Sequence, residues 1–349
     1  MRNSGGGGKP PPSAMNWEGE NMRTKYILKR LLYVIPTAFG VLVIIFILLR
    51  SMPGDFASAL LGPEATLEDM ERVREQYGLN ENILVQFVTY MKELITLNFG
   101  NSVIYQTPVI DMIKEAFPAT LELAVMGMFW ALLISVPLGI LSAVKQNSWL
   151  DNISMVFAQV GISMPVFWMG LLMILLFSVH LNWLPSFGRG DPLIPALIEG
   201  ISTGDFDSFI NSFQKILMPS FALGIMGSAM ISRMIRSTML EVLDMDYIRT
   251  ARAKGTKERK VVMKHAFRNA LPPVITIVAL QFGSLLGGSI VTETVFSWPG
   301  IGQVLVTAIL NRDYSVVQAS VFLIAVLFII INLVVDLLYA VINPKINEG

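Results

Sequence analysis

Six stretches of this 349-residue chain contain no Asp, Glu, Lys or Arg. They cover residues 31–49, 123–144, 152–188, 216–232, 269–292 and 314–335, and the third is strongly apolar only over about 153–179. A helix of about 20 apolar residues crosses the roughly 30 Å hydrocarbon layer of a membrane. Hydrocarbon satisfies no backbone polar group, so such segments span as helices. We therefore predict an all-α polytopic membrane protein with six transmembrane helices, the third kinked at Pro165.

The composition agrees with a membrane protein and argues against nucleic-acid, metal and catalytic sites in this chain. Charged residues make up 15% of the chain, against roughly 25% in soluble proteins. The formal net charge is zero, so we expect no nucleic-acid partner. The chain has no Cys, and its two His, His180 and His265, lie far apart, which argues against a metal site. No phosphate-binding loop or nucleophile motif is present, so we predict no enzyme and no cofactor in this chain.

The distribution of basic residues predicts the orientation, because Lys and Arg concentrate in cytoplasmic loops. With both termini in the cytoplasm, the inside segments after the first 21 residues hold sixteen Lys or Arg and six Asp or Glu. The outside segments 50–118, 180–215 and 294–318 hold eight Lys or Arg and fifteen Asp or Glu. The opposite orientation would place the most basic loop outside. We therefore predict that both termini are cytoplasmic.

The segments outside the spans divide the chain into four parts. Residues 1–21 are rich in Gly and Pro and are predicted to be a disordered leader. Residues 22–50 form a cytoplasmic segment and the first span. Residues 51–118 form an extracytoplasmic helical loop, with a capping box at Thr66-Leu-Glu-Asp69 opening a helix that Gly78 closes, and a second helix over about 81–97. This loop is either a structured lid or a docking surface. Residues 119–345 form a five-helix core.

The cytoplasmic loop 237–272 of this core contains two short helical patterns on either side of Gly255, a residue that suits a helix end with positive φ. Tyr247, Ile248 and Ala251 fall on one face of the first pattern, with basic residues around them. Basic loops often lie near anionic lipid. A simple connector needs only a few residues, however, and this loop has about forty, so we predict a cytoplasmic protein partner.

The segment 246–255, Asp-Tyr-Ile-Arg-Thr-Ala-Arg-Ala-Lys-Gly, resembles the coupling motif of ABC importer permeases of the dipeptide, oligopeptide and nickel group. Segments 117–122, 161–168, 293–302 and 332–339 resemble this group in the same order, so the resemblance covers about residues 22–345. The general family motif begins Glu-Ala-Ala, whereas this chain has Arg249-Thr-Ala251, and its run 189–215 is longer than usual. The residues that the resemblance places against an ATPase are Asp246, Tyr247, Arg249, Thr250, Ala251, Arg252, Lys254 and Gly255.

The resemblance implies a type I ABC importer permease fold in the cytoplasmic membrane of a bacterium or archaeon. It further implies a second homologous permease, an extracytoplasmic solute-binding protein, surrounding membrane lipid, and two cytoplasmic ATPase subunits that hold ATP and Mg²⁺. The implied solute is a dipeptide or oligopeptide, with a nickel chelate or glutathione as alternatives. An ion-gradient secondary transporter would need several charges inside spans, whereas only Asp336 lies well within one.

The fifth span carries small residues whose role the sequence leaves open. Gly283, Ser284, Gly287 and Gly288 include a Gly-xxx-Gly pattern, which is typical of close helix packing. The alternative is that they line the translocation path. Glu293 follows this span near its outer end, where we expect it to line the mouth of the path.

Overall fold

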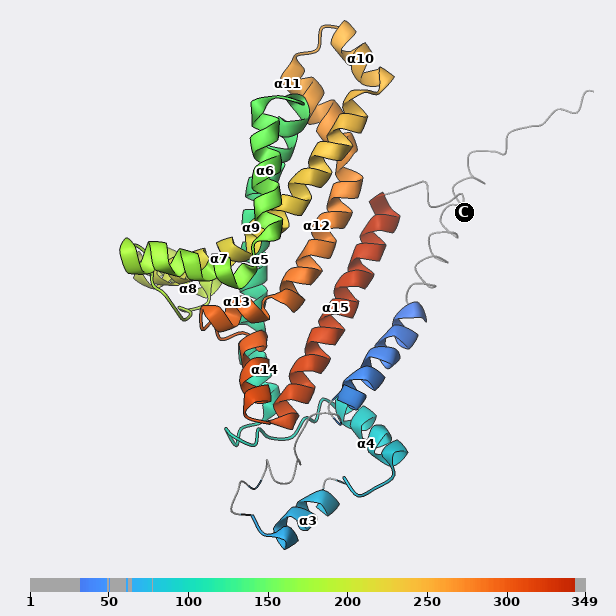
Figure 1. The fold of residues 1–349 in the computed structure, drawn as a ribbon, viewed down its shortest axis with the longest axis vertical. Coiled ribbons are helices and arrows are strands. Elements are labelled where there is room, and N and C mark those ends of the chain that lie inside the picture. The colour runs from blue at the N-terminus through green and yellow to red at the C-terminus, as the bar shows by residue number, and fades with distance from the viewer. Residues whose placement is uncertain (1–31, 49, 51–60, 62–64, 77, 343–349) are drawn as a thin grey trace, which may run out of the picture.

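Figure 1 shows the computed structural model, which describes residues 32–48, 50, 61, 65–76 and 78–342; of Gln76, Gly288 and residues 336–342 only the backbone is described. The predicted leader lies outside the described residues. An apolar helix, Leu32–Leu48, comes first. It is followed by α3 (Leu67–Gln76), α4 (Ile83–Thr96), α5 (Val109–Val144), α6 (Trp149–Ser163), α7 (Val166–Met173), the π-helix η1 (Ile174–His180), α8 (Leu193–Thr203) and α9 (Asp207–Leu243). The rest of the chain forms α10 (Asp246–Ala253), α11 (Glu258–Lys260), η2 (Val261–Phe267), α12 (Arg268–Gly288), α13 (Ile290–Val295), α14 (Ile301–Leu310) and α15 (Tyr314–Ile342).

Helices occupy all six predicted stretches, and the described residues contain no strand, which confirms the all-α membrane fold. Among the described residues, four helices are long and apolar enough to cross a membrane: α5, α9, the run Glu258–Gly287, and α15 over Tyr314–Val335. The bent pair Trp149–Ser163 and Val166–His180 adds a fifth if it forms one span. The first stretch is described as the apolar helix Leu32–Leu48, which is bounded by residues that the structure does not describe. The third stretch forms two helices, and its geometry differs from the prediction.

The break between α6 and α7 is much sharper than the predicted kink. The two helices meet at 102°, and Figure 1 shows α7 lying across the long axis of the bundle. Pro165 has no N–H and disfavours helical geometry at the residue before it. Met164 accordingly has φ −81° and ψ 126°, and Pro165 has φ −61° and ψ 136°. The prediction of one kinked helix was therefore wrong, because two consecutive residues leave the helical conformation.

The helices α5 and α9 form the centre of the bundle and approach each other through glycines. A Cβ atom added at Gly224 of α9 would lie 2.6 Å from the carbonyl oxygen of Gly127 and from the Cβ of Trp130, both on α5. A Cβ at Gly139 would lie 2.7 Å from the Cβ of Ile235. Small residues at these crossings let the two backbones pack closely, as in many membrane bundles. The main apolar core surrounds this contact and includes residues of η2 and α12.

Two ion pairs connect the long helices to their neighbours. Arg236 of α9 donates from Nε and Nη2 to the two carboxylate oxygens of Asp151 on α6, at 2.7 and 2.8 Å. Arg189 donates to Glu122 of α5 at 2.9 and 2.6 Å, and its guanidinium lies over the ring of Trp298. Bidentate arginine–carboxylate pairs fix orientation as well as distance. Arg189, the first residue of the long run 189–215, thus binds this run to α5.

Between the first span and α5, the helix α3 has the predicted cap at each end. The Oγ1 atom of Thr66 accepts a hydrogen bond from the Asp69 N–H at 3.2 Å and donates to the Asp69 carboxylate at 2.6 Å. This hydroxyl hydrogen bond lowers the pKa of the Asp69 carboxyl. Gly78 has φ +62° after α3, and Asn82 caps α4 by accepting from the Leu84 N–H at 3.0 Å. Buried residues of α4 pack against the first helix, α5 and α15.

Candidate coupling site between α9 and α12

The predicted coupling segment forms the helix α10 at one end of the molecule. Figure 1 shows α10 and α11 at the end of the bundle opposite α3 and α4. The helix follows the end of α9 after a short turn and leads through α11 and η2 into α12. A displacement of α10 therefore reaches α9 through residues 244–245, and through the turn 254–257 it reaches the long helical run Glu258–Gly287 that contains α11, η2 and most of α12.

A narrow apolar edge holds α10 on the bundle. Ile248 is completely buried and Ala251 is half-buried against the main core, which includes Val261 and Ala266 of η2. Tyr247, which the sequence placed on the same face, is 45% exposed, and its hydroxyl accepts a hydrogen bond from Nδ2 of Asn269 at 3.2 Å. Tyr247 shares this face but its ring stays largely at the surface, so the buried edge consists of Ile248 and Ala251.

The rest of α10 is exposed and mixes charge with apolar surface. Arg249 is 69% exposed and is only loosely paired with Asp246, at 3.6 Å. Met245, just before the helix, is 51% exposed. Such a surface fits a protein partner, because cations supply electrostatic complementarity while Met and Tyr supply contact area. The exposed members of the predicted site are Asp246, Tyr247, Arg249, Thr250, Arg252, Lys254 and Gly255.

A Schellman motif ends α10 at the predicted glycine. Gly255 has φ +74°, which confirms the predicted positive φ. Its N–H donates to the Arg252 carbonyl at 2.9 Å, and the Thr256 N–H donates to the Ala251 carbonyl at 3.2 Å. A Cβ at Gly255 would meet no atom within 4 Å. Glycine is therefore required here by the backbone conformation and not by lack of space.

An ion pair across this turn stiffens it. Arg252 donates to the two oxygens of Glu258 from Nη2 at 2.8 Å and from Nε at 3.2 Å, and this hydrogen bonding raises the pKa of the Arg252 guanidinium. The pair joins α10 to α11. Glu258 and Asn269 were not among the predicted site residues, although an acid shortly after a turn-forming glycine could have suggested the first. In the described residues no cluster of His, Cys, Asp or Glu could hold a metal.

The small residues of α12 separate into two environments. Gly283 is buried, and a Cβ added there would lie 3.0 Å from Cγ2 of Ile331 on α15. Ser284 is exposed, and a Cβ at Gly287 would meet nothing within 4 Å. Gly283 is therefore a packing position, whereas Ser284 and Gly287 face space that this chain leaves open. Of Gly288 only the backbone is described.

Glu293 lies in a different environment from the one expected. Its side chain is completely buried. The carboxylate accepts hydrogen bonds from the hydroxyls of Thr120 and Ser289 at 2.8 Å each and from the Gln303 N–H at 3.1 Å. It therefore joins α5, α13 and α14, and within this chain it does not line an open mouth. Thr120 lies 173 residues away in sequence, so no local pattern could have revealed the contact.

The two environments on α12 predict different effects for the same substitution. Gly283→Leu should lower the midpoint of thermal unfolding of the purified protein, because overpacking costs about 1–3 kcal/mol. Gly287→Leu should leave the midpoint unchanged and reduce solute uptake, because its side chain would enter open space. Equal thermal effects of the two substitutions would contradict this assignment.

Two family models match the chain. Residues 135–348 match the binding-protein-dependent transport system inner membrane component, and residues 23–124 match the N-terminal part of such membrane components. The chain is 44% identical over 329 residues to a dipeptide transport system permease protein of Alkalihalophilus pseudofirmus, with 92% of this chain and 99% of the relative covered. It is also 44% identical over 322 residues to a glutathione transport system permease protein of Escherichia coli, with 92% and 98% covered.

The fold is similar to that of a solved transporter. An inward-facing structure of the MetNI methionine ABC transporter superposes with a TM-score of 0.53 at 18% sequence identity. The superposition covers 66% of this chain and 96% of the solved chain. This similarity agrees with the predicted permease fold.

Proposed function

The chain belongs to the family of inner membrane components of binding-protein-dependent transport systems, and from this membership we propose that it forms half of the translocation path of an ATP-driven peptide importer. The observation that carries the proposal is α10, an exposed helix with a rigid end that connects directly to two long helices of the bundle. A helix with a rigid end can pass a displacement on to the two long helices, because it moves as a unit.

We propose that α10 inserts into a cytoplasmic ATPase subunit. Arg249, Arg252 and Lys254 would supply the charge complementarity at this contact. Two such subunits would hold ATP and Mg²⁺ and would hydrolyse ATP, while a second homologous permease completes the path and an extracytoplasmic binding protein delivers the solute. Both termini and α10 would then lie on the cytoplasmic side of a bacterial or archaeal membrane, as the distribution of Lys and Arg supports.

Dipeptides or oligopeptides are the proposed solutes. The 44% identity to a dipeptide transport system permease over nearly the whole chain supports this choice. Glutathione is the second candidate, because the identity to a glutathione transport system permease is the same.

Uptake by vesicles that contain the complete transporter tests this function. We expect ATP-dependent uptake of a labelled dipeptide in the presence of the binding protein, and no competition by excess glutathione. Uptake of glutathione alone would select the second candidate. Uptake that needs an ion gradient and no ATP would contradict the importer assignment.

A further inference from the structure

Two arginines three residues apart on α9 point to α6, and among the described side chains only one of the two has a counter-charge. Arg236 is neutralised by the buried carboxylate of Asp151. Arg233 is exposed, and its Nη2 donates at 3.1 Å to Oε1 of Gln159, a neutral amide. In the part of the chain that the structure describes, no acidic side chain forms an ion pair with Arg233. Within the described residues, the charge of Arg233 is therefore not balanced by an acidic side chain.

Arg233 is the first charged residue after the uncharged stretch 216–232 of α9, so its guanidinium lies where the apolar part of that span ends. Asp151 and Gln159 are eight residues apart on α6, which corresponds to about 12 Å along the axis. The guanidinium of Arg233 is therefore displaced along α6 from the Arg236–Asp151 pair, away from the α10 end. Charged groups at membrane depth are expensive in lipid and usually face a water-filled cavity or a partner group.

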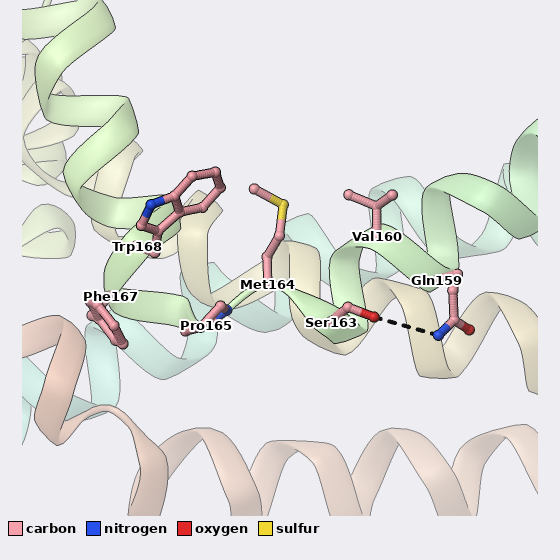
Figure 2. A pocket seen from close by; sticks show the side chains of 7 residues that line it. All are labelled: Gln159, Val160, Ser163, Met164, Pro165, Phe167 and Trp168. Atoms are coloured by element: carbon pink, nitrogen blue, oxygen red, sulfur yellow. Dashed lines mark hydrogen bonds between the residues drawn. The ribbon is translucent and has the colours of Figure 1, made fainter.

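An apolar cavity that is wide open to the surface of this chain lies next to Gln159, the residue that contacts this cation. It has a volume of about 490 Å³ and is lined by Gln159, Val160, Ser163, Met164, Pro165, Phe167 and Trp168. In Figure 2 the side chains of Val160, Met164 and Trp168 point to the same side, while Phe167 points away from it. Gln159 joins the cavity to the cation, because its Nε2 donates to Oγ of Ser163 at 3.4 Å while its Oε1 accepts from Arg233.

The cavity lies at the break between α6 and α7, which also argues against a lipid environment. Ser163 and Pro165 are exposed where the helical hydrogen bonding is interrupted. Interrupted backbone at membrane depth is tolerated where it is buried in protein or lines an aqueous cavity, because lipid cannot satisfy the free polar groups. The exposed surface around Gln159 and Ser163 is therefore expected to face either a water-filled path or a partner subunit.

We propose that Arg233, Gln159 and the cavity at the α6–α7 break form a solute-recognition site that binds the carboxylate end of a short apolar peptide during translocation. This inference rests on the proposed peptide-import function. Arg233 binds the carboxylate, since arginine is suited to bidentate carboxylate recognition. Gln159 orients the guanidinium, and Val160, Met164 and Trp168 contact the apolar side chain of the C-terminal residue.

The test compares two peptides in vesicles that contain the complete transporter. One is a dipeptide with a C-terminal Phe and the other is its C-terminal amide, each supplied at a concentration that saturates the binding protein. Arg233→Gln should lower the maximal import rate of the free acid by about tenfold or more and leave the rate of the amide unchanged. Arg233→Lys, which keeps the charge but cannot form the bidentate contact, should restore only part of the rate. Lys145→Gln, which removes an exposed charge at the end of α5, should change neither rate.

Each of the following results would overturn the proposal. An equal loss for both peptides, or loss of the second permease from the purified complex, would assign Arg233 to the contact between permeases. Unchanged rates for both would assign it to lipid headgroups. If the wild-type transporter imports neither peptide, the proposed function fails and this inference fails with it. If the wild-type transporter imports the peptides but the Arg233 variants import them at the same rates, only this inference is contradicted.

Discussion

Replacing Gly255 with Val is expected to lower import at least about tenfold while the protein still inserts and binds its partner permease. Gly255 has φ +74°, a conformation that costs an L-residue about 1–2 kcal/mol and a β-branched residue more. The Schellman hydrogen bonds that end α10 would break, and the orientation of Arg252 and Lys254 would change with them. We expect ATP-dependent uptake to fall at least about tenfold, since about 1.4 kcal/mol corresponds to that factor.

Gly255→Asn is the matched control, because Asn tolerates the left-handed conformation. No atom lies within 4 Å of a Cβ at this position, so an added side chain meets no steric obstacle. Asn should therefore retain most of the uptake. Similar losses for Val and Asn would show that a side chain at this position is itself harmful, and would contradict the conformational explanation.

Gly300→Ala is expected to destabilise the protein by about 3 kcal/mol, near the upper end of overpacking costs. An added Cβ would lie 2.5 Å from Oγ1 of Thr120 and would also clash with the carboxyl carbon of Glu293. Gly300 has φ −97°, which any residue adopts, so this cost is steric. The clash would separate Thr120 from Glu293 and leave a buried carboxylate short of a hydrogen bond.

Thermal unfolding of the purified protein measures this effect. Gly287→Ala on α12 provides the control, since its Cβ would meet no neighbouring atom, and we expect no loss of stability there. A stable Gly300→Ala variant would mean that the contact among α5, α13 and α14 is loose enough to accommodate a methyl group.

Features that depend on local chemistry could be predicted from the sequence. The Thr66 cap of α3 and the positive φ of Gly255 follow from residue types at fixed spacing. The all-α membrane architecture follows from the uncharged stretches, because hydrocarbon allows few alternatives. In each of these cases the physical cause lies within a few residues of its effect.

Features that depend on distant contacts could not be predicted. Pro165 indicates an interruption of the third span. The 102° angle between α6 and α7, however, depends on contacts between residues that are distant in sequence, for example Gly170 and Phe296. Glu293 was expected at an open mouth because it follows the fifth span, and its burial depends on Thr120. Likewise, the exposure of Tyr247 depends on how narrowly α10 rests on η2.

The contact between α10 and an ATPase subunit is the central claim, and a site-directed cross-link tests it most directly. The chain contains no Cys, so Thr250→Cys introduces its only thiol, on an exposed position of α10. We predict that a thiol-attached photoreactive group at this position joins the chain to an ATPase subunit in the assembled transporter, while the same group at Arg72→Cys on α3 does not. Failure of Thr250→Cys to form this adduct in an ATP-hydrolysing complex would contradict the account.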